Sequence, residues 1–248
     1  MREMSEPILW ADLDAEPSGG FAAELLGHPL IALAPGSGPD GGNAIRVDYV
    51  AFEEGSRRVV VRYPLGASGD EMTLCYAVRF GEDFQFVLGG KLHGVVPDRP
   101  VTGGQPPRPD GWSSRVMWRA GGGLETYVYE QDKTGKWGIG RRAAGFRFRR
   151  GRWHAISIHT RLNTGPGAHD GFTHVYADGR RVIEHDGLRF RASTEPGTEI
   201  THATFCTFHG GNNPLWSPVG RSGERITVHA LFSHIAVYQG LRVLRLDR

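Results

Sequence analysis

Polar and apolar residues alternate along most of the chain from Arg57 onward, which is the pattern of half-buried β-strands. Turn residues interrupt this alternation every ten or so positions, and only Phe21–Leu26 suggests a short helix. We therefore expect an all-β protein, a β-sandwich or jelly roll of two antiparallel sheets with few short helices. The expected strands are 57–63, 72–80, 84–88, 113–119, 124–130, 153–161, 173–177, 180–184, 200–209 and 226–239.

The length of 248 residues and the 39% hydrophobic content suit one domain spanning 1–248, in which residues 1–45 form a wrapping N-terminal arm. The segment Val95–Gly111 contains five prolines, too many for a strand interior, so we expect a long surface loop that could act as a lid. Asp178-Gly179 lies between two alternating runs and predicts a tight hairpin.

The stretch 112–130 predicts a second hairpin, with two chemically different faces. A three-residue loop at 120–122, with glycine in the left-handed position, pairs Arg119 with Gly123. This register gathers the apolar side chains of both strands on one face, whereas a four-residue loop would mix the faces. The other face then carries four polar side chains, with Arg115 opposite Tyr127 and Ser113 opposite Tyr129.

The formal net charge is only +2, from 29 basic and 27 acidic residues, so an anionic partner must be bound by a local patch. We expect no nucleic-acid or membrane partner. The most basic stretch, Arg141–Arg152, is interpreted as a solvated strand edge.

The two cysteines, Cys75 and Cys206, each lie in a strand-like run, and we expect buried thiols in preference to a disulfide, which would require their strands to lie side by side. No His-Glu-x-x-His or comparable spacing occurs among the 11 histidines, so we expect neither a metal nor another cofactor. No export signal is visible near the N-terminus, which predicts a cytoplasmic protein, or a secreted one if the N-terminus has been trimmed. We expect a monomer.

Three motifs together resemble the family 14 polysaccharide lyases, the alginate and glucuronan lyases of algal viruses and molluscs. They are the Gly-Gly-Lys-Leu run at 89–92, Ser113-x-Arg115 and Tyr127-x-Tyr129. The Gly-Gly-containing segment 204–216 adds to the likeness, which covers roughly residues 58–238. The resemblance implies a metal-independent site made of Lys91, Ser113, Arg115, Tyr127 and Tyr129.

The implied reaction is β-elimination in a 4-linked uronic-acid polymer, either alginate (polymannuronate) or glucuronan. Lys91 and Arg115 would neutralise the uronate carboxylate. Tyr127 or Tyr129 would act as base and acid, since nearby cations stabilise a phenolate. Ser113 would bind a hydroxyl or the carboxylate. Further substrate-binding candidates are Gln85, Trp216, and two histidines at which this chain departs from the family pattern, His93 and His209.

Two other function classes fit an exposed sheet face. A non-catalytic carbohydrate-binding module or lectin would also use exposed tyrosine and tryptophan side chains. A glycoside hydrolase on a similar sandwich would need two carboxylates flanking the bond, and Glu125, near the hairpin face, has no matching partner in the sequence.

Overall fold

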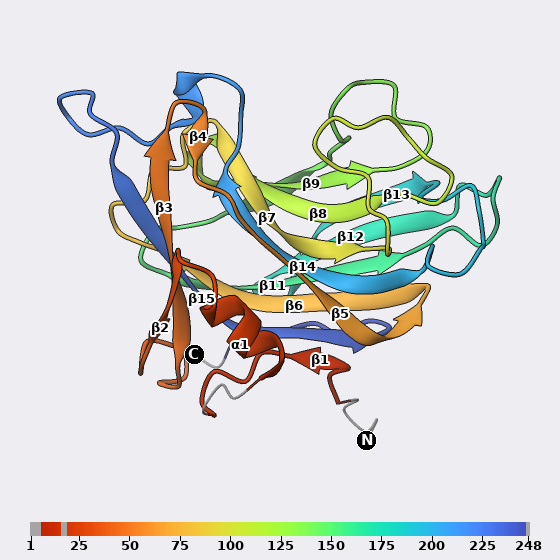
Figure 1. The fold of residues 1–248 in the computed structure, drawn as a ribbon, viewed down its shortest axis with the longest axis horizontal. Helices are drawn as coiled ribbons and strands as arrows, with labels where there is room; N and C mark the ends of the chain where they lie inside the picture. The colour runs from red at the N-terminus through yellow and green to blue at the C-terminus, as the bar shows by residue number, and fades with distance from the viewer. Residues whose placement is uncertain (1–5, 16–18, 247–248) are drawn as a thin grey trace.

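The computed structural model describes residues 6–15 and 19–246, which form a sandwich of two antiparallel sheets (Figure 1). The predicted fold class is confirmed. The strands are β1 (Leu9–Trp10), β2 (Ile31–Ala34), β3 (Ala44–Phe52), β4 (Gly55–Ser56), β5 (Val59–Gly69), β6 (Glu71–Phe80), β7 (Gly89–Val96), β8 (Ser113–Arg119), β9 (Gly123–Tyr129), β10 (Arg142–Arg147), β11 (Trp153–Arg161), β12 (Gly171–Ala177), β13 (Arg180–Leu188), β14 (Ile200–His209) and β15 (Thr227–Gln239). The helical segments are α1 (Gly20–Leu26) and two 3-10 turns, η1 (Ala120–Gly122) and η2 (Pro214–Trp216).

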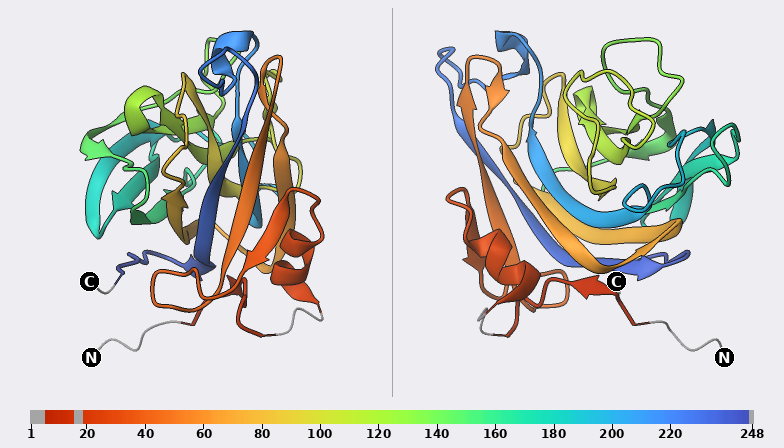
Figure 2. Two further views of the ribbon diagram at one scale, coloured as in Figure 1. Left: turned by 90° about the vertical axis from the view of Figure 1, so that its left-hand side faces the viewer. Right: turned by 45° about the vertical axis from the view of Figure 1, so that its right-hand side comes forward.

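The larger sheet has nine strands, seven of them in the order β13-β12-β11-β6-β15-β3-β2, with β1 paired to β15 and β4 to β3. The smaller sheet has six strands in the order β10-β9-β8-β7-β14-β5. Both sheets bend in the same sense, and the six-stranded sheet lies on the inner side of the bend (Figure 2). Its outward face is therefore concave.

The core between the sheets is rich in large aromatic side chains, among them Tyr49, Phe80, Phe84 and Trp118. Burying one such ring contributes about 1.5–3 kcal/mol relative to leaving it exposed. The six-stranded sheet makes room for Trp118 through Gly90, whose Cβ, if present, would lie 2.0 Å from the indole ring. The Gly-Gly-Lys run is thus shaped by packing on the core side of the strand.

The hairpin β8–β9 has the predicted register, with Arg115 opposite Tyr127 and Ser113 opposite Tyr129. Its turn is the expected three-residue loop, and Gly121 adopts a left-handed φ of 66°. The predicted hairpin at Asp178-Gly179 is also confirmed, between β12 and β13.

The expected strand at 84–88 is wrong. Residues 84–86 are irregular and follow a turn that is closed by a hydrogen bond from Phe84 N–H to the Gly81 carbonyl. Residues 87–88 form a second turn, in which Val87 has a φ of 42°. Phe84 and Phe86 alternate because both rings pack on Phe80, at 4.5 and 5.0 Å between centroids. The alternation at 84–88 therefore arises from the inward packing of these two rings and not from strand pairing.

The N-terminal arm contributes more than a covering layer, because β1 and β2 both add to the nine-stranded sheet. Helix α1 confirms the predicted short helix, and its Phe21 ring contacts Tyr63 of β5 in the opposite sheet at 5.2 Å. This segment therefore links the two sheets. No helix among residues 6–15 and 19–246 has the length and apolar content to cross a membrane.

Candidate active site on the concave sheet face

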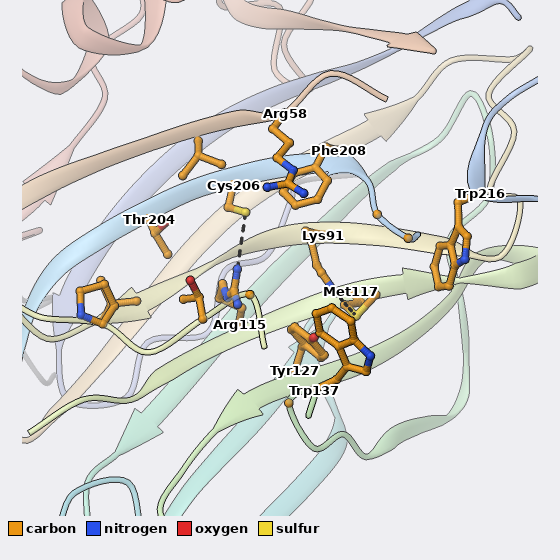
Figure 3. A pocket seen from close by; sticks show the side chains of 18 of the residues that line it. Arg58, Lys91, Arg115, Met117, Tyr127, Trp137, Thr204, Cys206, Phe208 and Trp216 are labelled. Atoms are coloured by element: carbon orange, nitrogen blue, oxygen red, sulfur yellow. Dashed lines mark hydrogen bonds between the residues drawn. The ribbon is translucent and has the colours of Figure 1, made fainter. Parts of the chain in front are cut away.

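A pocket of about 480 Å³ opens on the concave face of the six-stranded sheet. Five of the six strands, or residues next to them, supply its floor, and loops after β7, β9 and β14 form its rim. Figure 3 shows side chains from these strands converging on the pocket. The floor residues used below are Arg58, Arg62, Lys91, Arg115, Met117, Arg119, Tyr127, Thr204, Cys206 and Phe208.

The charges that line this pocket all have one sign. Arg58, Arg62, Lys91, Arg115 and Arg119 are lining residues, and no aspartate or glutamate of the described chain is among them. A concave surface with one sign of charge concentrates its field and attracts an anionic ligand. The nearly neutral protein thus carries the local cationic patch that an anionic partner requires.

Lys91 lies at the centre of the pocket, paired with Met117 across β7 and β8. Its Nζ donates a hydrogen bond to Met117 Sδ at 3.1 Å and lies 3.5 Å from the centroid of the Tyr127 ring. Burial lowers the pKa of Lys91 well below its usual value, and the nearby charge of Arg115 lowers it further. The neutral amine is therefore accessible at much lower pH than for an exposed lysine.

Tyr127 is the tyrosine that faces the pocket, and burial raises the pKa of its hydroxyl. Its oxygen lies 3.2 Å from the hydroxyl of the fully buried Tyr129. The Tyr129 oxygen accepts a hydrogen bond from Gly104 N–H at 2.9 Å, which leaves its own hydrogen free to point toward Tyr127. Tyr127 can then direct its proton into the pocket.

Arg115 is a buried cation with unused hydrogen-bonding capacity. The residue is 6% exposed, and its Nη1 donates a long hydrogen bond to the sulfur of Cys206 at 3.8 Å. Among the described residues, Arg115 Nε has no hydrogen-bond partner. A buried guanidinium with an unpaired N–H group is strongly stabilised by a carboxylate, because the two carboxylate oxygens can accept two parallel hydrogen bonds.

Two of the five residues implied by the resemblance anchor a loop and do not line the pocket. Ser113 is buried and donates its hydroxyl to the Val101 carbonyl at 3.0 Å, while Tyr129 holds Gly104. Both partners belong to the proline-rich segment after β7, whose residues Pro100, Thr102 and Gly103 form part of the rim. The expectation that Ser113 binds a substrate hydroxyl or carboxylate does not fit this geometry.

The histidine expectations also need correction. His93 is fully buried between the sheets, with its ring stacked on Phe205 at 3.9 Å, and its Nδ1 accepts the Cys206 N–H. A register shift between Lys91 and Gly94 breaks the alternation, which turns His93 toward the core. In this position its side chain does not line the pocket.

His209 is likewise 1% exposed and lies outside the pocket, with Nε2 hydrogen-bonded to the Gln85 carbonyl at 2.7 Å. The Gln85 side chain is also engaged elsewhere, since its amide binds the backbone N–H and carbonyl of Val219. Of the four additional substrate-binding candidates, Trp216 alone lines the pocket.

Sequence reasoning missed the half of the site that β5 and β14 provide. Thr204, Cys206 and Phe208 share one face of β14, and Arg58 and Arg62 lie beside them on the segment leading into and along β5. Their period-two spacing was a usable signal, although it could not say which surface they share. Cys206 and Cys75 are free, buried thiols, as expected.

An arginine–glutamate–arginine bridge marks the hairpin end of the pocket. Arg119 donates to Glu125 Oε1 at 2.6 Å, and Arg142 of β10 donates to Glu125 Oε2 at 3.0 Å. Both cations hold the pKa of this buried carboxyl below its usual value despite the opposing effect of burial. Glu125 is therefore a charged anchor for two arginines.

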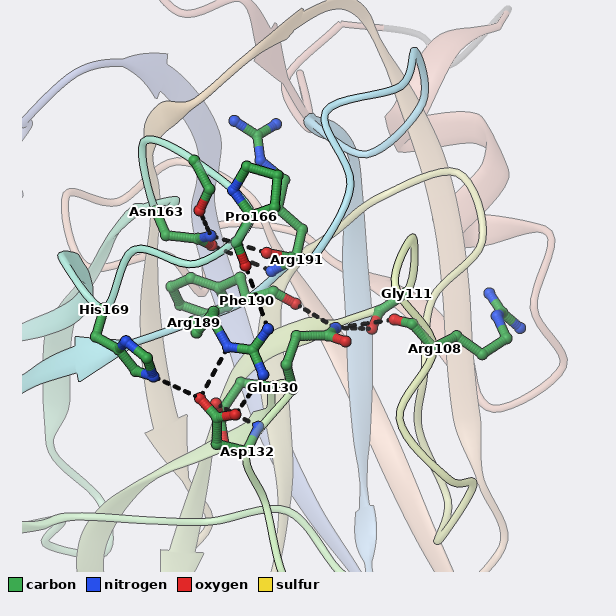
Figure 4. Close-up of polar contacts among 12 residues, drawn as sticks. Arg108, Gly111, Glu130, Asp132, Asn163, Pro166, His169, Arg189, Phe190 and Arg191 are labelled. Atoms are coloured by element: carbon green, nitrogen blue, oxygen red, sulfur yellow. Dashed lines mark hydrogen bonds and ion pairs between the residues drawn. The ribbon is translucent and has the colours of Figure 1, made fainter.

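The loops behind the rim are tied together by polar contacts (Figure 4). The Gln131 side-chain amide donates to the carbonyls of Arg108 and Phe190, each at 2.8 Å. Next to it, Asp132 binds the Arg189 guanidinium and lies 2.9 Å from His169 Nε2. These contacts fix the base of the proline-rich loop relative to the β9–β10 loop, which carries the rim residue Trp137.

Within residues 6–15 and 19–246, no cluster of three or more His, Cys, Asp or Glu side chains could hold a metal ion.

Comparison with known proteins gives one family and a set of similar structures. The model of the family Polysaccharide lyase 14 matches residues 59–223. The crystal structure of the marine PL-14 alginate lyase from Aplysia kurodai is 22% identical, with a TM-score of 0.71, over 95% of this chain and 100% of that chain. An alginate lyase from Chlorella virus is 21% identical, with a TM-score of 0.68, over 94% of this chain and 100% of that one.

A more distant likeness extends to the endo-β-1,4-glucuronan lyase from the fungus Trichoderma reesei, at 15% identity and a TM-score of 0.58, over 85% of this chain and 87% of that chain. These likenesses show a common fold. A search of curated proteins found no match.

Proposed function

The chain belongs to polysaccharide lyase family 14, and we propose that it cleaves a 4-linked uronic-acid polymer, polymannuronate in alginate or glucuronan, by β-elimination. One observation carries this proposal. The pocket brings a lysine with a lowered pKa into contact with a tyrosine with a raised pKa, among arginines and without a lining carboxylate. Relatives named as alginate and glucuronan lyases share the fold.

The chemical obstacle is the uronate carboxylate, whose negative charge makes the neighbouring proton on C5 very weakly acidic. Arg115 is suited to neutralise it, because its guanidinium faces the pocket with an unpaired Nε and carries a permanent charge. Cations aimed at developing negative charge in a water-poor site contribute several kcal/mol, on the order of 3, to transition-state stabilisation.

The pKa shifts of Lys91 and Tyr127 favour a different assignment of the base and the acid from the one expected from sequence. A lysine whose pKa is lowered can accept a proton as a neutral amine, and a tyrosine whose pKa is raised stays protonated. Environments that push two pKa values apart in this way mark the base and the acid. We therefore assign Lys91 as the base and Tyr127 as the acid, with Tyr129 orienting the Tyr127 hydroxyl.

The reaction balances with these two groups. The C5 proton passes to Lys91 Nζ, its electron pair forms the C4–C5 double bond, and the C4–O bond breaks. The leaving oxygen takes the proton of Tyr127. Because Lys91 Nζ lies against the Tyr127 ring, the resulting ammonium stabilises the phenolate until the proton returns.

The contact between Lys91 and Tyr127 also indicates which uronate the protein cleaves. Lys91 and Tyr127 approach a bound sugar from one side, so the proton must leave and the oxygen must be protonated on the same face of the ring. The C5 hydrogen and the C4 oxygen lie on the same face in D-mannuronate and D-glucuronate, and on opposite faces in L-guluronate. This supports polymannuronate or glucuronan over polyguluronate.

Neither a metal nor another cofactor is required by this scheme, because cationic side chains perform the neutralisation. We expect activity to persist after exhaustive treatment with a chelator. A hydrolytic mechanism is not supported, since the acid nearest the pocket, Glu125, is bound to two arginines and lacks a second carboxylate across the cleft.

The test is to incubate the protein with polymannuronate, polyguluronate and polyglucuronate and to follow the ultraviolet absorbance of the unsaturated uronate end. A rise with polymannuronate or polyglucuronate is expected. Binding of these polymers without any rise would identify a carbohydrate-binding protein instead. Release of reducing ends without ultraviolet absorbance would indicate hydrolysis.

A further inference from the structure

A second hollow, of about 710 Å³, lies at the edge of the six-stranded sheet, beside the turn of the β8–β9 hairpin. We call it the edge hollow. Its walls come from the hairpin turn, from β10 and the residues that follow it, from the start of β11, and from the β12–β13 turn. The chemistry proposed above uses none of these walls apart from Arg119 at the junction.

The edge hollow is strongly cationic. Five arginines line it, namely Arg119, Arg142, Arg147, Arg149 and Arg152. The one acidic lining residue of the described chain, Asp178, is occupied by His154 Nδ1 at 2.9 Å and by the Ala155 N–H at 3.0 Å. The excess of positive charge is therefore available to an external anion.

Three of the five arginines form no salt bridge among the described residues, and one of them, Arg152, lies near enough to Asp178 to lower the pKa of that carboxyl. The other two are the arginines on which the proposal rests. Among the described residues, neither Arg147 nor Arg149 forms a salt bridge, and both side chains are exposed. Arg147 makes one hydrogen bond, to the Gly121 carbonyl at 3.3 Å. Charges that only protect an edge strand need no concave surface, whereas these line a hollow that also contains the half-buried ring of Phe146.

The edge hollow and the catalytic pocket share one lining residue. Arg119 lines both, and its bond to Glu125 is shared with Arg142, which lines the edge hollow alone. The bridge thus neutralises the single carboxylate at the junction. A polyanion that extends from the pocket past Arg119 of β8 would next meet Arg142 and Arg147 of β10.

We propose that the edge hollow binds further uronate residues of the same polymer whose cleavage the pocket carries out. This inference rests on the proposed function. Arg147 and Arg149 would pair with sugar carboxylates through bidentate hydrogen bonds, and the Phe146 ring would pack against the apolar face of a sugar. Long chains would thereby be held more tightly than short ones.

The test compares Arg147→Ala/Arg149→Ala with Arg150→Ala/Arg221→Ala, a control that removes two exposed arginines outside both hollows. KM is measured for the long polymer that the parent cleaves and for the tetrasaccharide of the same uronate, at low and high salt. Thermal unfolding of each variant verifies that it is folded.

The first variant should raise the ratio of polymer KM to tetrasaccharide KM about fivefold at low salt, and the difference should shrink at high salt because exposed charges are screened. The control should leave the ratio near that of the parent. If the KM ratio is unchanged in the first variant, or changes equally in both variants, the edge hollow does not bind the polymer. The proposed function stands in that case. An affinity for DNA that falls in the first variant while the ratio stays constant also overturns the proposed role of the edge hollow. Absence of turnover by the parent on every uronate polymer overturns the proposed function and this inference with it.

Discussion

The Nζ atom of Lys91 lies 3.5 Å from the centre of the Tyr127 ring, although the two residues are 36 positions apart and come from non-adjacent strands, β7 and β9. Burial acts on them in opposite directions, lowering the pKa of the lysine and raising that of the tyrosine.

Replacing Lys91 with arginine should abolish turnover while keeping the positive charge. An arginine cannot become a neutral base at ordinary pH, so kcat should fall about 100-fold or more, the usual contribution of a general base. Steady-state kinetics on the cleaved polymer measure this. If the arginine variant keeps near-parent kcat, Lys91 acts only as a neutralising charge.

The pH profile should follow the ionisation of Lys91 on its acidic side. Because burial lowers the pKa of Lys91, the active neutral amine forms well below the usual lysine pKa of about 10.4, and kcat/KM rises as pH increases through the lowered value. Burial raises the pKa of Tyr127, so the alkaline decline should begin only above the usual tyrosine pKa of about 10. A profile that declines as pH rises through neutrality would contradict both assignments.

The two tyrosines should respond differently to loss of their hydroxyls. Tyr127→Phe should lower kcat about 100-fold or more by removing the proton donor, with polymer binding retained. Tyr129→Phe removes the acceptor of the Gly104 N–H and should lower the free energy of unfolding by about 1–3 kcal/mol, with a partial loss of kcat. Calorimetry and kinetics on both variants separate the roles. The reverse pattern, with Tyr129→Phe inactive and Tyr127→Phe active, would exchange the assignments.

Gly90→Ala should destabilise the protein, because the added methyl group would lie 2.0 Å from the Trp118 ring and 2.4 Å from the Phe208 carbonyl. Overpacking of this kind costs about 1–3 kcal/mol. Gly135→Ala, where no atom lies within 4 Å of the added carbon, is the matched control. Chemical denaturation measures both, and equal stability of the two variants would mean that Trp118 repacks without cost.

Several features of the site could be predicted from local sequence. The β8–β9 register followed from period-two alternation and a glycine able to adopt a left-handed turn, and it placed Arg115 opposite Tyr127. Other expectations failed where local rules are broken. The bulge after Lys91 turned His93 into the core, and the alternating residues 84–88 packed inward without a strand partner.

The sequence by itself determined the all-β class, the short helix and the hairpin that carries Arg115 and Tyr127, because turn chemistry and strand alternation act over a few neighbouring residues. The tertiary structure alone decided which strands face that hairpin. Arg115 meets Cys206 across 91 positions of chain, and the order β9-β8-β7-β14-β5 brings the four arginines of the pocket together with Lys91 and Tyr127. Pairing between distant strands depends on how two whole sheet faces pack, and no local pattern encodes that choice.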